Sequence, residues 1–149
     1  MKNRFNIDIY DKRDSAEAAT AAAIIFYAEN NSAPVIGLAT GNTMTGVYKK
    51  LVDREARQPG MFNACHFIQL DEMVVLGGIG DNHSKAGIFN TDIQQQFLGQ
   101  LNGRYASFIG LPASFDDPDK TVANHLDKIA ALGGVDIQLL GIGVNGHIG

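Results

Sequence analysis

A chain of 149 residues with a formal net charge of −4 is long enough for one domain with its own hydrophobic core. Hydrophobic residues make up 45% of it and charged residues 19%, which excludes a disordered chain. The acidic balance argues against nucleic acid as a partner, and the single cysteine excludes an internal disulfide and a cysteine-built metal site. We expect that cysteine, Cys65, to be a small buried hydrophobe.

The sequence shows no targeting or membrane-spanning segment. Residues 1–10 lack the apolar core of a signal peptide. The most apolar stretch, 18–28, is shorter than the roughly 20 residues that cross a bilayer. We therefore expect a cytoplasmic protein with no membrane partner.

Strand and helix patterns alternate along the sequence. Alternating apolar and polar residues predict a half-buried strand over 5–10, and apolar runs predict strands over 34–39, 65–70, 105–109 and 135–141. Helices are expected from 14 or 15 to 30, over 43–57, from 84 or 85 to 98 and over 116–132, with 73–85 irregular. This order predicts a single α/β domain over 1–149, with a doubly wound, mostly parallel sheet in a Rossmann-like three-layer sandwich.

Polar clusters follow three of the predicted buried strands directly. They are Thr40-Gly41-Asn42-Thr43, Asp71-Glu72 and Gly143-Val144-Asn145-Gly146-His147. In open α/β sheets, ligands bind beyond the carboxyl ends of the strands. If the three strands are neighbours, the clusters meet at one rim of the sheet, which is the central prediction.

The first cluster has the pattern of an anion site. It joins a strand to a helix, and the free N–H groups at a helix start favour a negative charge. It lacks the lysine of a P-loop and the glycine pattern of a dinucleotide fingerprint. The alternative is an ordinary strand-to-helix turn with Thr43 as the N-cap.

The second cluster offers a general base. A carboxylate at a partly desolvated rim has a raised pKa and can take a proton. Because adjacent side chains point to opposite sides, we expect one of Asp71 and Glu72 to face the pocket and the other a backbone partner. The alternative is a solvated loop or a helix cap.

The third cluster places a histidine among glycines. His147 beside Asn145 is suited to moving protons near neutral pH, and the alternative is an incidental loop histidine. His66 and His125 are expected to be structural, whereas His83 follows the second cluster and is a candidate neighbour of the pocket. No spacing typical of a metal site connects the histidines.

Taken together, the three clusters with their flanking residues, 37–43, 70–72 and 140–149, resemble the glucosamine-6-phosphate deaminase (isomerase) family in order and spacing. The similarity covers almost the whole chain. The wider superfamily includes 6-phosphogluconolactonase, but the ending Asn-Gly-His-Ile-Gly is more similar to the deaminases.

The resemblance implies a role for each matched residue. Asp71 would be the base that takes the C2 proton of the opened sugar, His147 would assist ring opening, and Asn145 would orient His147 or the sugar. Residues 40–43 would hold the sugar phosphate, and the further substrate-binding positions are Glu72, Gly143 and Gly146. The implied reaction is aldose–ketose isomerisation with loss of ammonia, and it needs no metal or cofactor.

Departures from the family pattern affect specificity. Asn42 and Met44 stand where the family has a second glycine and a proline, and residues 82–85 lack its His-Pro-x-Ser-Tyr pattern. Galactosamine 6-phosphate therefore remains an alternative substrate. The family's second acid would lie three residues beyond Gly149, so we expect an incomplete sheet and a fragment with little deaminase activity alone.

Two other functions stay open. One is a 6-phosphogluconolactonase-type hydrolase, in which water is activated instead of a carbon acid. The other is a non-catalytic sugar-phosphate sensing domain. In each case the expected partner is a small sugar phosphate, and the sequence leaves homo-oligomer formation undecided.

Overall fold

The computed structural model describes residues 6–73 and 87–149. Four parallel strands form its sheet, in the order β3-β2-β1-β4. They are β1 (Val35–Leu38), β2 (His66–Gln69), β3 (Ser107–Ile109) and β4 (Ile137–Gln138). The helices are α1 (Arg13–Asn30), α2 (Asn42–Arg57), α3 (Ile88–Gln96) and α4 (Pro118–Ala131), and the short 3-10 helix η2 (Leu98–Leu101) follows α3. The predicted α/β class with a parallel sheet is confirmed.

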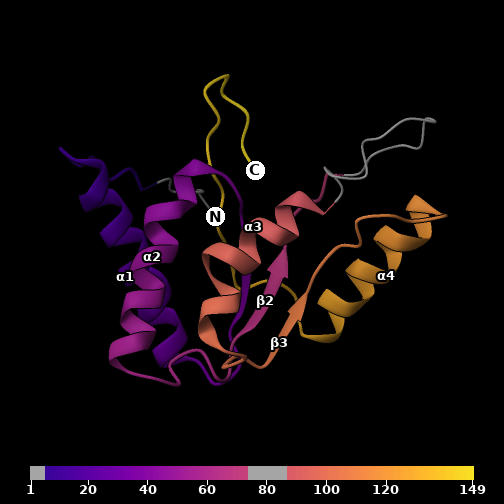
Figure 1. Ribbon diagram of the computed structural model, residues 1–149, viewed down its shortest axis with the longest axis horizontal. Coiled ribbons are helices and arrows are strands. Elements are labelled where there is room, and N and C mark those ends of the chain that lie inside the picture. The colour runs from indigo at the N-terminus through magenta and orange to yellow at the C-terminus, as the bar shows by residue number, and fades with distance from the viewer. Residues whose placement is uncertain (1–5, 74–86) are drawn as a thin grey trace.

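The connections between strands place the helices in layers around the sheet. The crossovers β1–α2–β2 and β2–α3–β3 move across the sheet in one direction, and β3–α4–β4 returns past both central strands. Right-handed crossovers therefore put α2 and α3 on one face and α4 on the other. In Figure 1, α1 lies beside α2, and α4 lies beyond the edge strand β3. The direction reverses between β1 and β4, which is where doubly wound sheets bind ligands.

Aromatic residues dominate the core between the sheet and the helices α2 and α3. Ile36 and Phe67 are register partners on one face of the sheet, and both are fully buried. Phe97 packs edge-to-face on Phe67 with ring centroids 5.2 Å apart, and it stacks on Tyr48 at the same separation. Cys65 is buried among these side chains, as expected.

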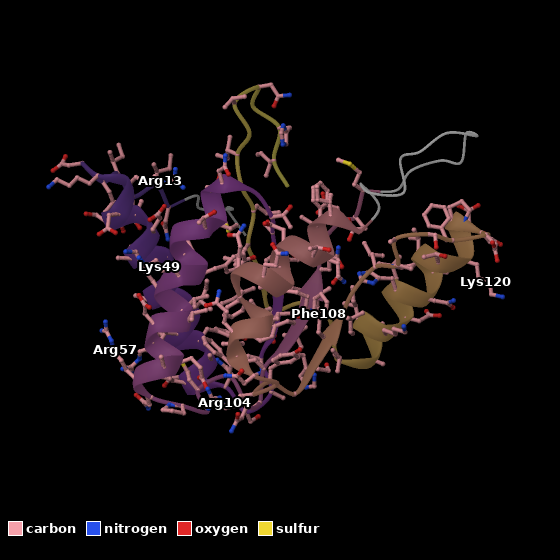
Figure 2. All side chains as sticks on the ribbon, in the orientation of Figure 1. Arg13, Lys49, Arg57, Arg104, Phe108 and Lys120 are labelled. Carbon is pink, nitrogen blue, oxygen red and sulfur yellow. The ribbon has the colours of Figure 1, made fainter. Side chains whose placement is uncertain are left out.

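A buried carboxylate supports the end of the molecule where the strands begin. Both oxygens of Glu55, 1% exposed, accept main-chain N–H groups, from Gly60 at 2.6 Å and Met61 at 3.0 Å. The Nε of Arg104 lies 3.0 Å from the same carboxylate. Figure 2 shows Arg104 at the end of the molecule opposite Arg13, which lies near the start of α2.

Two predicted strands differ from the structure. Residues 6–10 form no strand, and Ile7 and Ile9 are 81% and 90% exposed. The alternating pattern suits a strand, but residues 6–10 do not lie along a strand of the sheet, and a strand needs a hydrogen-bonded neighbour to form. The strand expected over 135–141 is shorter in the structure. It spans Ile137–Gln138 beside β1, and the main-chain hydrogen bonds from Asp136 to Val35 and from Leu139 to Gly37 flank it before the chain enters a loop.

Two expectations concern the segment between β2 and α3, of which the structure describes only the ends. His83 and most of the loop expected over 73–85 lie outside the described residues. Among the described residues, α3 begins at Ile88, after Gly87 with a φ of 73°. No helix in 6–73 or 87–149 is both long and apolar enough to cross a membrane.

Candidate active site

The three polar clusters meet at the carboxyl ends of the strands. Residues 39–43 after β1, Leu70 and Asp71 after β2, and the loop after β4 line a cavity of about 350 Å³. In Figure 1, this loop rises above the sheet at the end toward which β2 points. The convergence predicted from the sequence is therefore present in the structure. Among the predicted site residues, the structure brings these to the cavity wall: Thr40, Gly41, Asn42, Thr43, Asp71, Gly143 and His147.

The turn after β1 leaves the start of α2 open toward the cavity. Gly41 precedes the helix with a φ of 92° and a ψ of 173°, a combination that is essentially restricted to glycine. Gly41 occupies the N-cap position, and no side chain in 6–73 or 87–149 caps this helix, so Thr43 is not the N-cap that the alternative interpretation required. Two main-chain N–H groups and two threonine hydroxyls near the cavity suit an oxyanion, which a helix N-terminus attracts.

The adjacent carboxylates Asp71 and Glu72 have separate environments. Asp71 lines the cavity, where burial and the neighbouring charge of Glu72 raise its pKa. Glu72 does not line this cavity. Burial alone would raise the pKa of Glu72, but hydrogen bonds from Asn90, Phe89, Gln69 and Met73 outweigh it and lower the pKa. This matches the expectation that one carboxylate faces the pocket and the other a backbone partner.

The substrate-binding role expected for Glu72 is not what its geometry supports. Its oxygens accept the N–H groups of Phe89 at 3.0 Å and Asn90 at 2.8 Å, both in the first turn of α3. It therefore caps α3, and a helix cap of this kind stabilises the fold. This is the helix cap given above as the alternative for Asp71 and Glu72. The sequence did not indicate which helix is capped, because the capped turn lies 17 and 18 residues further along.

A tight loop holds His147 at the cavity. An antiparallel bridge between Ile142 and Ile148 closes it, and Gly143 N–H donates to the carbonyl of His147 at 2.8 Å. A Cβ on Gly143 would overlap the His147 ring, so only glycine leaves room for this imidazole. Gly146 has a φ of 84° and forms the turn rather than the cavity wall.

Asn145 fixes the imidazole of His147. The amide oxygen of Asn145 contacts Nδ1 of His147, and it also accepts the main-chain N–H of His147 at 3.4 Å. Because an amide oxygen only accepts, this contact favours the imidazole tautomer that has its proton on Nδ1 and a lone pair on Nε2. Asn145 itself lies outside the cavity lining, so it is placed to orient His147.

Several apolar residues complete the cavity wall. They are Ala39, Leu70, Phe89, Gly141, Ile142, Val144 and Gly149. All except Phe89 lie within the segments 37–43, 70–72 and 140–149 that the sequence singled out, but they had no assigned role in the reaction. Apolar side chains after a strand carry no chemical signal of their own, and Phe89 comes from the start of α3. His66 lies elsewhere, with its Nδ1 2.7 Å from the Ser107 hydroxyl of β3, and His125 lines a separate groove beside α4. No cluster of three or more potential metal ligands occurs in 6–73 or 87–149.

The fold and the cavity define an α/β protein with a cavity at the switch point of a parallel sheet. No protein-family model matches the chain. It is similar to curated proteins named glucosamine-6-phosphate deaminase. The match from Corynebacterium aurimucosum is 33% identical and covers 96% of this chain and 54% of that protein. The match from Clostridium beijerinckii is 36% identical and covers 91% and 55%, respectively.

A solved structure shares the fold. This monomeric glucosamine-6-phosphate deaminase aligns with a TM-score of 0.73 and 24% identity, over 93% of this chain and 56% of that one. The resemblance to the glucosamine-6-phosphate deaminase family that the three clusters indicated is confirmed over the shared residues. The chain spans about half the length of the curated relatives it matches.

Proposed function

We propose that the cavity is the substrate site of an amino-sugar-phosphate deaminase that converts glucosamine 6-phosphate, or its galactosamine epimer, to a ketose 6-phosphate and ammonia. The observation that carries this proposal is the shared cavity of Asp71, His147 and the uncapped start of α2. The relatives named above carry this activity in their names, which supports the same chemistry here.

Each part of the cavity has a step in the proposed reaction. The turn at residues 40–43 binds the phosphate through main-chain N–H groups and hydroxyls, and this remote binding energy positions the reacting carbons. The free Nε2 of His147 takes and returns the proton of the sugar hydroxyl as the ring opens.

Asp71 supplies the base for the isomerisation. Its carboxylate removes the proton from C2 of the open-chain sugar, and the electron pair forms a C1–C2 double bond while the C1 carbonyl oxygen takes a proton, which gives an enolamine. A proton is then added at C1 and the amine nitrogen gives one up, so that C1 carries a hydroxyl and C2 an imine. The resulting imine at C2 is hydrolysed by water, which releases ammonia and leaves the ketose. The raised pKa of Asp71 makes its carboxylate a stronger base than an exposed aspartate.

The remaining features of this proposal concern the chain as a whole. We propose one α/β domain over 1–149, acting on a small sugar phosphate without metal, cofactor or nucleic acid. A cytoplasmic location follows from the proposed substrate, because a doubly charged phosphate does not cross an apolar bilayer unaided.

The test is proton exchange at C2 of glucosamine 6-phosphate in deuterated water, followed by proton NMR. We expect the wild-type chain to bind the sugar phosphate and, whatever its overall rate of ammonia release, to exchange its C2 proton. We expect Asp71→Asn to bind the sugar phosphate equally well without exchange. Exchange that persists in Asp71→Asn removes Asp71 from the role of base. Hydrolysis of 6-phosphogluconolactone with no C2 exchange would favour the lactonase instead.

A further inference from the structure

A fully buried glutamine directly precedes the two residues after β2, Leu70 and Asp71, that line the cavity. Gln69 ends β2, is 0% exposed, and has the whole hydrogen-bonding capacity of its amide in use. Its Nε2 donates to the main-chain carbonyl of Asp71 at 2.8 Å and to Glu72 at 2.9 Å. Its Oε1 accepts from Leu111 N at 2.9 Å and from Asn90 Nδ2 at 3.2 Å. A polar side chain in a core strand costs stability unless it is satisfied in this way.

These hydrogen bonds join three segments that are far apart in the sequence. Gln69 belongs to β2, Asn90 to the first turn of α3, and Leu111 to the loop after β3. Glu72 extends the cluster, since both its oxygens bind the start of α3. Gly110 leaves room for it, because a Cβ there would lie 2.8 Å from Asn90 Nδ2 and 3.2 Å from Gln69 Oε1.

The cluster determines which of the two adjacent carboxylates reaches the cavity. The bond from Gln69 to the Asp71 carbonyl fixes the main chain at the point where β2 ends. The bonds to Glu72 hold its carboxylate on the α3 side, outside the cavity. Asp71 is left as the carboxylate that faces the cavity.

We propose that Gln69 and Glu72 are positioning residues that aim the Asp71 carboxylate into the cavity and keep the second carboxylate out of it. The catalytic consequence rests on the proposed function, because it needs Asp71 to be the base. The structural part does not, since it concerns only the orientation and the acidity of Asp71.

The charged and titratable groups around Asp71 make this measurable. Among the described residues, Glu72 is its neighbour in sequence, His147 shares its cavity, and His125 of α4 approaches the main chain of Gln69. Removing the charge of Glu72 lowers the pKa of Asp71. Gln69→Leu removes one of the hydrogen bonds that hold Glu72 and the bond that fixes the Asp71 carbonyl. The two carboxylates then come closer together, which raises that pKa further.

The test is a carbon-13 NMR titration of the Asp71 carboxyl group in the ligand-free chain. We expect Glu72→Gln to lower the pKa of Asp71, Gln69→Leu to raise it, and the effect of Gln69→Leu to disappear when both changes are combined. Glu55→Gln is the matched control, because it also removes a buried carboxylate that binds main-chain N–H groups, but at the other end of the strands. It should leave the pKa of Asp71 unchanged.

The outcomes separate this inference from the proposed function. If both single variants stay folded and leave the pKa of Asp71 at its wild-type value, the positioning role is wrong. If Gln69→Leu does not fold, Gln69→Asn, which keeps the amide but shortens its reach, replaces it in the same titration. C2 exchange gives the catalytic readout: we expect Gln69→Leu to slow it on the order of 100-fold at saturating substrate, with the dissociation constant unchanged. Predicted pKa shifts in a chain that performs no exchange would overturn the proposed function and leave the positioning role in place.

Discussion

Gly41→Ala tests whether the turn after β1 binds an anion. Gly41 has a φ of 92° and a ψ of 173°, and a Cβ built on it meets no atom within 4 Å. An alanine there suffers no collision with neighbours, so the cost is backbone strain alone. Strain of this kind is worth about 1–3 kcal/mol. At this chain length, each kcal/mol lowers Tm by about 2–4 °C.

The turn relieves that strain by rotating, and rotation redirects the N–H groups of Asn42 and Thr43 away from the cavity. A hydrogen bond to a charged group is worth about 1.5–3 kcal/mol. Losing one such bond to the phosphate therefore weakens binding of glucosamine 6-phosphate about 10- to 100-fold. Urea denaturation measures the stability loss, and isothermal titration calorimetry measures the affinity.

Gly133→Ala is the control. Gly133 also has a φ of 92° with no atom within 4 Å of a built Cβ, but it follows α4 at the opposite end of the strands. We expect the two variants to lose similar stability, and only Gly41→Ala to lose affinity. Equal loss of affinity in both, or unchanged affinity in Gly41→Ala, would refute the assignment of this turn as the phosphate site.

Three further outcomes follow from the same contacts. Asp71→Asn should raise the free energy of unfolding at pH 7. Folding raises the pKa of Asp71, so its ionised carboxylate destabilises the folded chain at neutral pH, and the asparagine removes this cost. Urea titrations should show the added stability vanishing below pH 3.8, where the aspartate is protonated in both states. Glu55→Gln should lower the free energy of unfolding by about 1.5–3 kcal/mol. Its control is Glu29→Gln, in the exposed pair with Arg54, which should change that free energy by less than about 0.5 kcal/mol. Equal losses would contradict a stabilising role for the buried Glu55 carboxylate. Gly143→Ala should displace His147, seen as altered imidazole NMR shifts, and an unchanged ring would show that the loop is not tightly packed.

The convergence of the three clusters was predictable from the sequence because a parallel sheet imposes it. Each cluster directly follows an apolar run, and parallel strands bring all their carboxyl ends to one edge. The sequence did not predict which strands are neighbours in the sheet. The structure shows the order β3-β2-β1-β4, which places the three strands that precede the clusters side by side. The roles of Asp71 and His147 stay predictions until exchange is measured.

The contacts made by residues remote in sequence were not predictable. Glu72 was interpreted as a binding residue with a helix cap as the alternative, and the contacts support the cap; the helix it caps, α3, lies too far along the chain to be predicted. Gln69 had one available signal, a polar residue in a core strand, whose explanation lies in Asn90 and Leu111. Residues 6–10 carry a strand pattern without a strand, since alternation specifies a face but provides no partner.

The most direct test of the site is an amide NMR titration of the nitrogen-15-labelled chain with glucosamine 6-phosphate. The structure predicts that the shifted amides cluster in three segments, at residues 40–43, at Asp71 and at 141–147, because these line one cavity. Shifts at only one segment, or centred on the groove beside α4, would show that the three loops do not form a common binding site.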